Sequence, residues 1–319
     1  MASNLALKVN MKYGGDTHHL PKAELEALLG ATDIETTAVF GADVAHPPVG
    51  GREGAPSVAC LVGSVDAEFM SYRGTMRLQA GRQEKIHDMR SMVKELLMIW
   101  KDKNNGQLPT SILFYRDGVS ESQFVHCRDY EIVEILEAYR DLIGKDKEHD
   151  KSLKLTFVVV GKRHNTRFYA KEAAHSYVNG NLKPGLLVED VVTDPSPYNF
   201  YLQSHQAIKG TARSAHYHVL RDDMQLGSAK LPSITHLLCF AFGRATKGVS
   251  YVAPAYMADR LCDRGQVYLR PWNDVAKEPA PRFQLSNNDK KNLSKEEINT
   301  KKQKFAEKLQ RRLVRDVGE

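Results

Sequence analysis

The sequence of 319 residues lacks any apolar stretch near the roughly 20 residues that a membrane-spanning helix needs. Its first residues also lack the charged and apolar segments of a secretory signal peptide. The four cysteines, Cys60, Cys127, Cys239 and Cys262, are scattered and form no CxxC pair, which argues against a zinc site and a disulfide framework. These absences predict an intracellular, cytoplasmic protein with reduced core thiols and no membrane contact, and they leave the nucleus open.

A strong charge of one sign is absent as well, because 45 basic and 39 acidic residues give a net charge of only +6. An excess this small does not by itself indicate nucleic-acid binding. The basic residues are clustered, however, at Lys8 and Lys12, at 162–167, at 209–213 and along the C-terminal tail. With 42% hydrophobic and 26% charged residues, the composition is typical of a globular protein of one large or two modest domains.

The apolar periodicity predicts the secondary structure. Residues 4–13 fit a strand and a helix equally, and either one places Lys8 and Lys12 on one face. A polar linker is expected at 14–34. Strands are predicted at residues 37–43, 57–64, 69–78, 111–115 and 155–160. Helices are predicted at residues 86–100, 120–142, 231–245, 254–264 and from 294 onward, with capping boxes at Ser120 with Gln123 and Ser294 with Glu297. This order predicts an α/β fold in which helices flank a mixed central sheet.

Two aspartates, Asp43 and Asp117, occupy matching places in this order. Each follows a short apolar run and precedes Gly or Pro punctuation, so both carboxylates are expected on a buried strand or at its end. A carboxylate in such a place loses hydration and needs a partner. Two converging strands that carry carboxylates predict a divalent-cation site, although a single Asp there also fits a cap or a turn.

Three strands, a helix and a fourth strand, with Asp on the first and fourth strands, resemble ribonuclease H. Seven motifs narrow this resemblance: GADVAHP at 41–47, RQE at 82–84, YRDGVSE at 115–121, KRHNTR at 162–167, FYLQSH at 200–205, HYHVL at 216–220 and PAYMA at 254–258. In their order and spacing they resemble the PIWI domain of eukaryotic Argonaute proteins, from about residue 4 to about residue 270. The resemblance implies a ribonuclease H-like fold.

The resemblance also implies an activity, that of a small-RNA-guided endoribonuclease, or slicer, of RNA silencing. Such an enzyme hydrolyses the target RNA with two divalent ions, usually Mg²⁺ with Mn²⁺ as an alternative, and leaves 3′-OH and 5′-phosphate ends. By motif position, Asp43 and Asp117 are implied metal ligands, and Asp259 takes the fourth position as a further ligand. Glu84 takes the implied role of the glutamate finger, on a loop that swings in to complete the site. Animal Argonautes commonly have His where Asp259 stands, but Asp still offers an oxygen ligand to a hard cation.

A binding surface for the guide RNA is implied in the same way. Lys8, Lys12 and Arg264 match residues that bind the guide 5′-phosphate. The positions that match contacts to the guide backbone are Lys162, Arg163, Arg167, His205, Arg213, Arg244, Ser250 and Tyr256. Such contacts position a strand without reading its sequence, so base pairing with the complementary target RNA would supply specificity.

Single residues leave structural alternatives open. Glu84 also suits the first turn of the helix predicted after it. Asp259 also suits a surface pair with Arg260 or Arg264, and His46 suits a local turn contact better than a metal. The two histidines of the HYHVL motif lack further zinc ligands, so they are expected in the core or facing RNA. A lone Lys or Arg also suits an ordinary surface charge.

The domain organisation predicted from the resemblance has three parts. Residues 1–34 are expected to be the end of a MID domain and a linker, 35–270 the PIWI domain, and 271–319 a basic C-terminal segment. The chain therefore resembles the PIWI-dominated piece of an Argonaute. The alternative function is a guide-binding effector that recruits silencing proteins and cleaves little. A ribonuclease H-like enzyme acting on DNA suits the carboxylates but not the RDGVS and KRH motifs.

Overall fold

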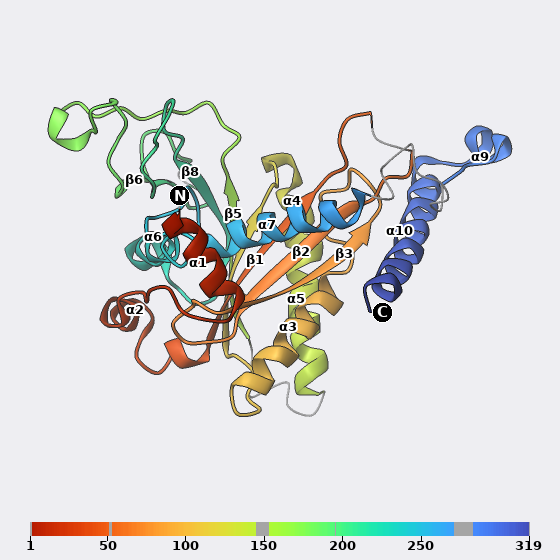
Figure 1. Cartoon of the computed structure of the whole chain (residues 1–319), viewed down its shortest axis with the longest axis horizontal. Helices are drawn as coiled ribbons and strands as arrows, with labels where there is room; N and C mark the ends of the chain where they lie inside the picture. The colour runs from red at the N-terminus through yellow and green to blue at the C-terminus, as the bar shows by residue number, and fades with distance from the viewer. Residues whose placement is uncertain (1, 51–52, 145–152, 195, 271–282, 319) are drawn as a thin grey trace.

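A central sheet organises the computed structural model, which describes residues 2–50, 53–144, 153–194, 196–270 and 283–318. Within these ranges eight strands lie in the order β3-β2-β1-β4-β5-β8-β7-β6 (Figure 1). Their bounds are β1 Thr37–Ala45, β2 Ser57–Ser64, β3 Tyr72–Gln79, β4 Ser111–Asp117, β5 Lys154–Gly161, β6 Leu186–Val188, β7 Asn199–Gln203 and β8 Ala215–Asp222. The first three strands form an antiparallel meander, and β4 pairs parallel with both β1 and β5. The predicted mixed sheet is confirmed.

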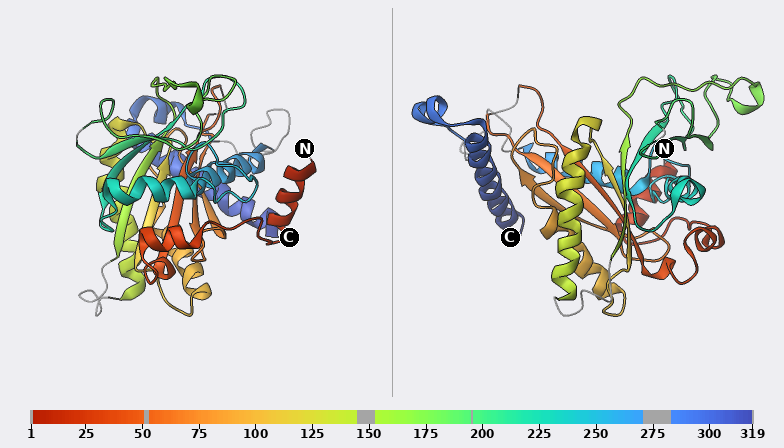
Figure 2. Two further views of the ribbon diagram at one scale, coloured as in Figure 1. Left: turned by 90° about the vertical axis from the view of Figure 1, so that its left-hand side faces the viewer. Right: turned by 180° about the vertical axis from the view of Figure 1, so that it is seen from behind.

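Helices cover both faces of this sheet. The described helices are α1 (Ala2–Lys12), α2 (Lys22–Leu29), α3 (Met89–Lys103), α4 (Phe124–His126), α5 (Ile132–Ile143), α6 (Gly227–Leu238), α7 (Ala253–Tyr268), α9 (Asn287–Asn292) and α10 (Lys295–Gly318). α7 lies across one face in Figure 1, and α3 and α5 lie across the opposite face, seen from behind in Figure 2. Because strand side chains alternate, Phe40 and Phe114 pack with α3 and α5, whereas Val39 and Tyr115 pack toward α6 and α7.

The N-terminal region corrects one expectation and resolves another. Residues 4–13 belong to the helix α1, on which Lys8 and Lys12 are both exposed. The prediction of a polar linker at 14–34 is wrong, because it contains α2. Leu25 and Leu29, four residues apart, bury one face of this helix in the core on the α7 side of the sheet.

Two helix boundaries also differ from the prediction. α3 begins at Met89, so the interpretation of Glu84 as a residue of its first turn is wrong, and Glu84 lies in the loop at 80–88. Arg82 in this loop has a φ of 63°, a left-handed conformation that a helix cannot continue. The helix predicted at 231–245 runs instead from Gly227 to Leu238, and the chain then turns before α7. Both capping boxes are confirmed.

The tail helix α10 packs beside the edge strand β3 (Figure 1). Its Ala306 and Leu309 are buried against Val58, Cys60 and Leu78. The four cysteines are free and buried, as the sequence predicts. None of the described helices combines the length and the apolar character needed to cross a membrane.

Candidate active site

Asp43 and Asp117 lie side by side at the carboxyl ends of two parallel neighbours, β1 and β4. The strand register pairs the residues that directly precede them. Asp43 is on the same face of β1 as Gly41, two residues earlier, and a Cβ at Gly41 would lie only 2.2 Å from the backbone carbonyl carbon of Pro254. The missing side chain therefore lets the start of α7 pack directly on β1, so that α7 covers the strand ends that carry the aspartates.

All four predicted catalytic carboxylates line one cavity of about 970 Å³. Asp43 and Asp117 come from the strand ends, Glu84 from the loop between β3 and α3, and Asp259 from α7. Segments up to 216 residues apart in sequence thus converge at one edge of the sheet. The structure therefore brings the predicted tetrad together, and each member's role stays a prediction.

The two strand-end carboxylates are short of compensating charge. Burial, the negative charge of Asp43 and that of Asp259 raise the pKa of Asp117 to about 7, although the Gly118 N–H donates to its Oδ1 at 2.7 Å. Burial also raises the pKa of Asp43, and Asp259 and Glu84 add to the effect while Arg116 opposes it. Both groups would therefore gain from a nearby cation.

Glu84 is held in a different environment. Burial alone would raise its pKa, but the hydrogen bond from His46 and the positive charge of Arg116 outweigh burial and lower it. His46 Nε2 lies 3.0 Å from Glu84 Oε2, and its Nδ1 lies 2.8 Å from the Ser57 hydroxyl. The expected local turn contact of His46 is therefore wrong, because this ring links β2 to the Glu84 loop.

The carboxylates of Glu84 and Asp43 face a common point next to Gly118. A Cβ at Gly118 would lie 3.0 Å from Oε1 of Glu84 and 3.1 Å from Oδ1 of Asp43. Gly118 has a φ of 88°, so both its backbone conformation and its lack of a side chain are needed here. The glycine of the RDG motif keeps open the space between two of the carboxylates.

Asp259 is the least available of the four carboxylates. Its Oδ2 accepts hydrogen bonds from Arg260 at 2.5 Å and from the Tyr251 hydroxyl at 3.4 Å. Asp259 therefore both lines the cavity and forms the pair with Arg260 that was predicted as an alternative. Burial and the nearby carboxylates of Asp117, Asp259 and Asp43 raise the pKa of Tyr251 well above the usual value, which keeps its hydroxyl a neutral donor.

The donor chemistry of this cavity fits a hard divalent cation. Four carboxylates line it, burial and like charge raise the pKa of Asp43 and of Asp117, and the buried Oε1 of Glu84 has an ion pair with Arg116 but no hydrogen bond from a described residue. In the part of the chain that the structure describes, no three acidic, His or Cys side chains stand close enough to grip one ion together. The cavity is therefore an open ligand set, which suits ions that retain several waters.

The raised pKa of Asp117 predicts a pH-dependent stability of the metal-free protein. Its folded-state pKa of about 7 exceeds the ordinary aspartate value of 3.8, so folding favours the protonated form, and this contribution is lost as pH rises from about 4 to about 7. Asp117→Asn should therefore raise the free energy of unfolding at pH 8, on the order of 2 kcal/mol, and change it much less at pH 4. Urea unfolding with EDTA at both pH values measures this. An equal difference at both pH values would contradict the prediction.

Several predicted guide-backbone residues gather beside the same cavity. Lys162 and Arg163 line it directly. Arg167 donates to the carbonyl of His164 at 3.0 Å, and Arg213 donates to the carbonyl of Lys162 at 3.4 Å. The loop after β5 thus carries a cluster of cations next to the carboxylates, as a surface for a phosphate backbone requires.

The remaining backbone-contact candidates lie in less charged surroundings. Burial and the positive charge of Lys162 lower the pKa of His205 to about 4, so this ring is neutral near pH 7. Arg244 stacks over the ring of Phe242 at 5.6 Å, and its buried Nε has no hydrogen-bond partner among the described residues. Tyr256 packs against the same ring at 4.9 Å. Ser250 lies in the turn before α7. Their RNA contacts stay predictions.

The three residues predicted to bind the 5′-phosphate are only partly brought together. Lys8 and Lys12 lie four residues apart on α1, near Gly243, where Met11 packs. Arg264 is exposed on α7, and its Nε donates to the hydroxyl of Tyr268 at 3.0 Å. No contact among the described residues joins Arg264 to the two lysines, so a shared phosphate pocket stays a prediction.

The buried ion pairs that support this cavity were not predicted from the sequence. Arg116, fully buried, pairs with the buried Glu131 at 3.1 Å and with Glu84 at 3.1 Å. The sequence held two signals for this pair. Arg116 is a charge inside the apolar run of β4, and Glu131 lies four residues before Ile135, on the buried face of a helix. Tyr251 gave no such signal, because its contacts depend on the turn before α7.

The chain is similar to several known proteins. The sequence model of the Piwi domain family matches residues 1–270. Protein argonaute 1C of Oryza sativa subsp. japonica is 40% identical over 288 residues, and Protein argonaute PNH1 of the same species is 39% identical over 286. Each alignment covers 84% of this chain and 28% of the relative, so the chain spans well under a third of their length.

Solved structures agree. The crystal structure of Kluyveromyces polysporus Argonaute with a guide RNA matches with a TM-score of 0.73 at 34% identity, covering 82% of this chain and 30% of that one. The C-terminal lobe of a budding yeast Argonaute matches with a TM-score of 0.76 at 32% identity, covering 89% and 58%. These likenesses confirm the predicted ribonuclease H-like fold.

Proposed function

Since the chain belongs to the eukaryotic Argonaute family and carries its PIWI domain, we propose that it is the catalytic part of a small-RNA-guided slicer. Its substrate would be an RNA target complementary to a guide with a 5′-phosphate. Hydrolysis of one target phosphodiester bond would leave 3′-OH and 5′-phosphate ends. Other proteins of a silencing complex would be its further partners.

One observation carries this proposal: Asp43, Glu84, Asp117 and Asp259 line one cavity that a cluster of cations adjoins. Arg116 and Arg260 pair with Glu84 and Asp259, whereas burial and like charge raise the pKa of Asp43 and of Asp117, so a further positive charge would stabilise these two carboxylates. A phosphodiester with its bound cations would supply this charge, because it combines the metal charge with a backbone that Lys162 and Arg163 can bind.

Each residue would have a distinct task. Bound Mg²⁺ ions, with Mn²⁺ as an alternative, would supply the charge that activates a water and stabilises the leaving 3′ oxygen. Asp43 and Asp117 would hold these ions from the rigid strand ends, with Asp259 and Glu84 completing the ligand set. Lys162 and Arg163 would hold neighbouring phosphates, so that the bond to be cut lies over the carboxylates.

The test uses the complete protein that contains this chain, loaded with a 5′-phosphorylated guide and given a matched, end-labelled RNA. We expect one cut opposite the centre of the guide, lost with EDTA and restored by Mg²⁺ or Mn²⁺. A target mismatched at the centre serves as the control. A bound and matched target that stays intact in Mg²⁺ would overturn the proposal.

That outcome would instead favour the second candidate, a guide-binding effector that recruits silencing proteins and cleaves little. The hold of Arg260 on Asp259 is the observation in its favour, because it engages one of the four carboxylates. Target binding without cutting, in the same assay, separates the two functions.

A further inference from the structure

The loop segment that carries Glu84 is held by one buried amide side chain. Nε2 of Gln79 donates to the carbonyls of Gln83 and Lys85, at 2.7 and 2.9 Å, on either side of Glu84. Oε1 of Gln79 accepts from the N–H of His87 at 3.1 Å. Gln79 is only 2% exposed, and all three bonds go to this loop.

Two further buried side chains complete the hold on the same backbone. Nη2 of Arg116 donates to the carbonyl of Glu84 at 2.5 Å, and Glu131 accepts from the N–H of Ile86 at 2.9 Å. Three consecutive carbonyls and the next two N–H groups are therefore bound by side chains. The loop has no regular secondary structure that would satisfy these groups itself.

This arrangement fixes where the carboxylate of Glu84 can lie. The segment begins just after Arg82, which has a left-handed backbone, so the loop needs outside contacts to keep its path. Without the Gln79 amide, two carbonyls would lose their donors, and the loop would gain by opening toward water. Opening would carry Glu84 away from Asp43 and Asp117.

We propose that Gln79 is a positioning residue that keeps Glu84 docked in the cavity. That cleavage needs Glu84 in the cavity rests on the proposed function. That Gln79 holds the loop does not depend on it. Gln79 touches the backbone beside Glu84 and not the reacting atoms, so its effect on cleavage acts through Glu84.

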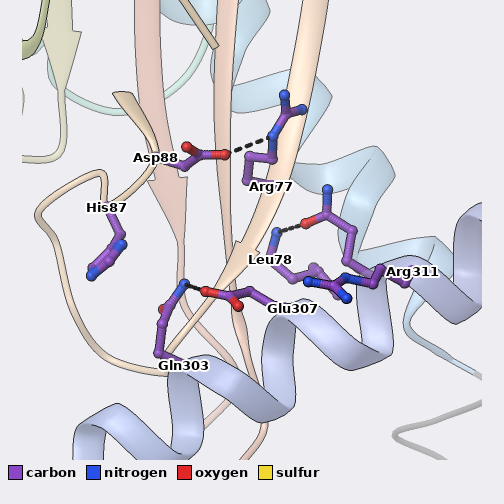
Figure 3. A pocket seen from close by; sticks show the side chains of 8 residues that line it. Arg77, Leu78, His87, Asp88, Gln303, Glu307 and Arg311 are labelled. Atoms are coloured by element: carbon purple, nitrogen blue, oxygen red, sulfur yellow. Dashed lines mark hydrogen bonds and ion pairs between the residues drawn. The ribbon is translucent and has the colours of Figure 1, made fainter. Parts of the chain in front are cut away.

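The three hydrogen bonds from Gln79 to the Glu84 loop form a clamp, and the C-terminal helix α10 supports this clamp from outside. Gln79 ends β3, which is the edge strand of the sheet within the described residues, so its outward N–H groups have no neighbouring strand there to bind them. Gln303 of α10 accepts from the N–H of Ala80 at 2.8 Å, and Gln310 accepts from the N–H of Leu78 at 2.7 Å. Figure 3 shows the Leu78 bond and the approach of α10 to β3. The residues on either side of Gln79 are thus fixed by the tail helix.

The first arm of the test measures single-turnover cleavage by the guide-loaded protein. Gln79→Ala and Gln79→Glu should each lower the rate at saturating target by about 10–100-fold, with guide and target affinities unchanged. Glu keeps the acceptor for His87 but loses both donations, so it should not rescue. In a Glu84→Ala background the Gln79 changes should have no added effect. A multiplicative loss in the double variant would overturn the proposal.

The second arm is independent of activity and measures hydrogen exchange of the loop amides in the same protein. Gln79→Ala should speed exchange of the His87 amide about tenfold or more. Gln303→Ala should also speed this exchange, but by less. Gln303→Glu should not speed it, because the glutamate keeps the acceptor for the Ala80 N–H. Gln107→Ala, at an exposed position, is the control. Unchanged exchange in Gln79→Ala would overturn the clamp. If the unmodified protein does not cut, but Gln79→Ala still speeds the exchange as expected, only the proposed function is overturned.

Discussion

Asp43→Asn and Asp117→Asn should each reduce guide-directed cleavage by at least roughly a thousandfold. The reason is that both carboxylates lie just after the last parallel pair of β1 and β4 and line one cavity, where each would hold a cation. Charge stabilisation by a bound metal is worth several kcal/mol, and each 1.36 kcal/mol of barrier is a factor of ten in rate. Asn keeps the shape of the side chain and removes only the charge. Single-turnover cleavage of a labelled target measures the loss.

Binding should be unaffected in these variants, because the cations beside the cavity remain. Asp102→Asn, at the exposed end of α3, makes the same charge change away from the cavity and should cut normally. The double variant should be no worse than either single variant, as expected for groups that act as one unit. A variant at Asp43 or Asp117 that retains more than a tenth of the cleavage rate would refute its assignment as a metal ligand.

Gly118→Ala should abolish most of the cleavage although it removes none of the four carboxylates. The added methyl group would lie 3.0 Å from Oε1 of Glu84 and 3.1 Å from Oδ1 of Asp43, in the space where these oxygens converge. Displacement of reacting groups by about an ångström can cost about a hundredfold in rate, and we expect a loss of that size or more. Cleavage and Mg²⁺ titration with the guide-loaded protein measure it.

The matched control is Gly106→Ala. Gly106 has a φ of 76°, close to that of Gly118, but a Cβ there would meet no atom of the described residues within 4 Å. Both variants should therefore lose about 1–2 kcal/mol of stability from the left-handed backbone. Only Gly118→Ala should lose cleavage. Equal cleavage by the two variants would show that the space between the carboxylates has no catalytic role.

The sequence was informative about the strands for a physical reason. A bounded apolar run such as the one before Asp117 has one favourable arrangement, a strand buried on both faces. A helix cap such as Ser120 with Gln123 acts within a single turn. Local signals of this kind do not depend on the rest of the chain. They misled at Glu84, where an amphipathic pattern suggested an earlier helix start, because the contacts that hold the loop come from β3, β4 and Glu131.

By itself, the sequence determined the α/β class, the strand-end positions of Asp43 and Asp117, and the family resemblance. Only the tertiary structure decided how these residues meet. Gly41 lets α7 approach β1, which places Asp259 in the cavity but beside Arg260. The Glu84 loop is docked through Gln79. Such contacts join segments far apart in the chain, and their geometry depends on packing and charge compensation that no local pattern encodes.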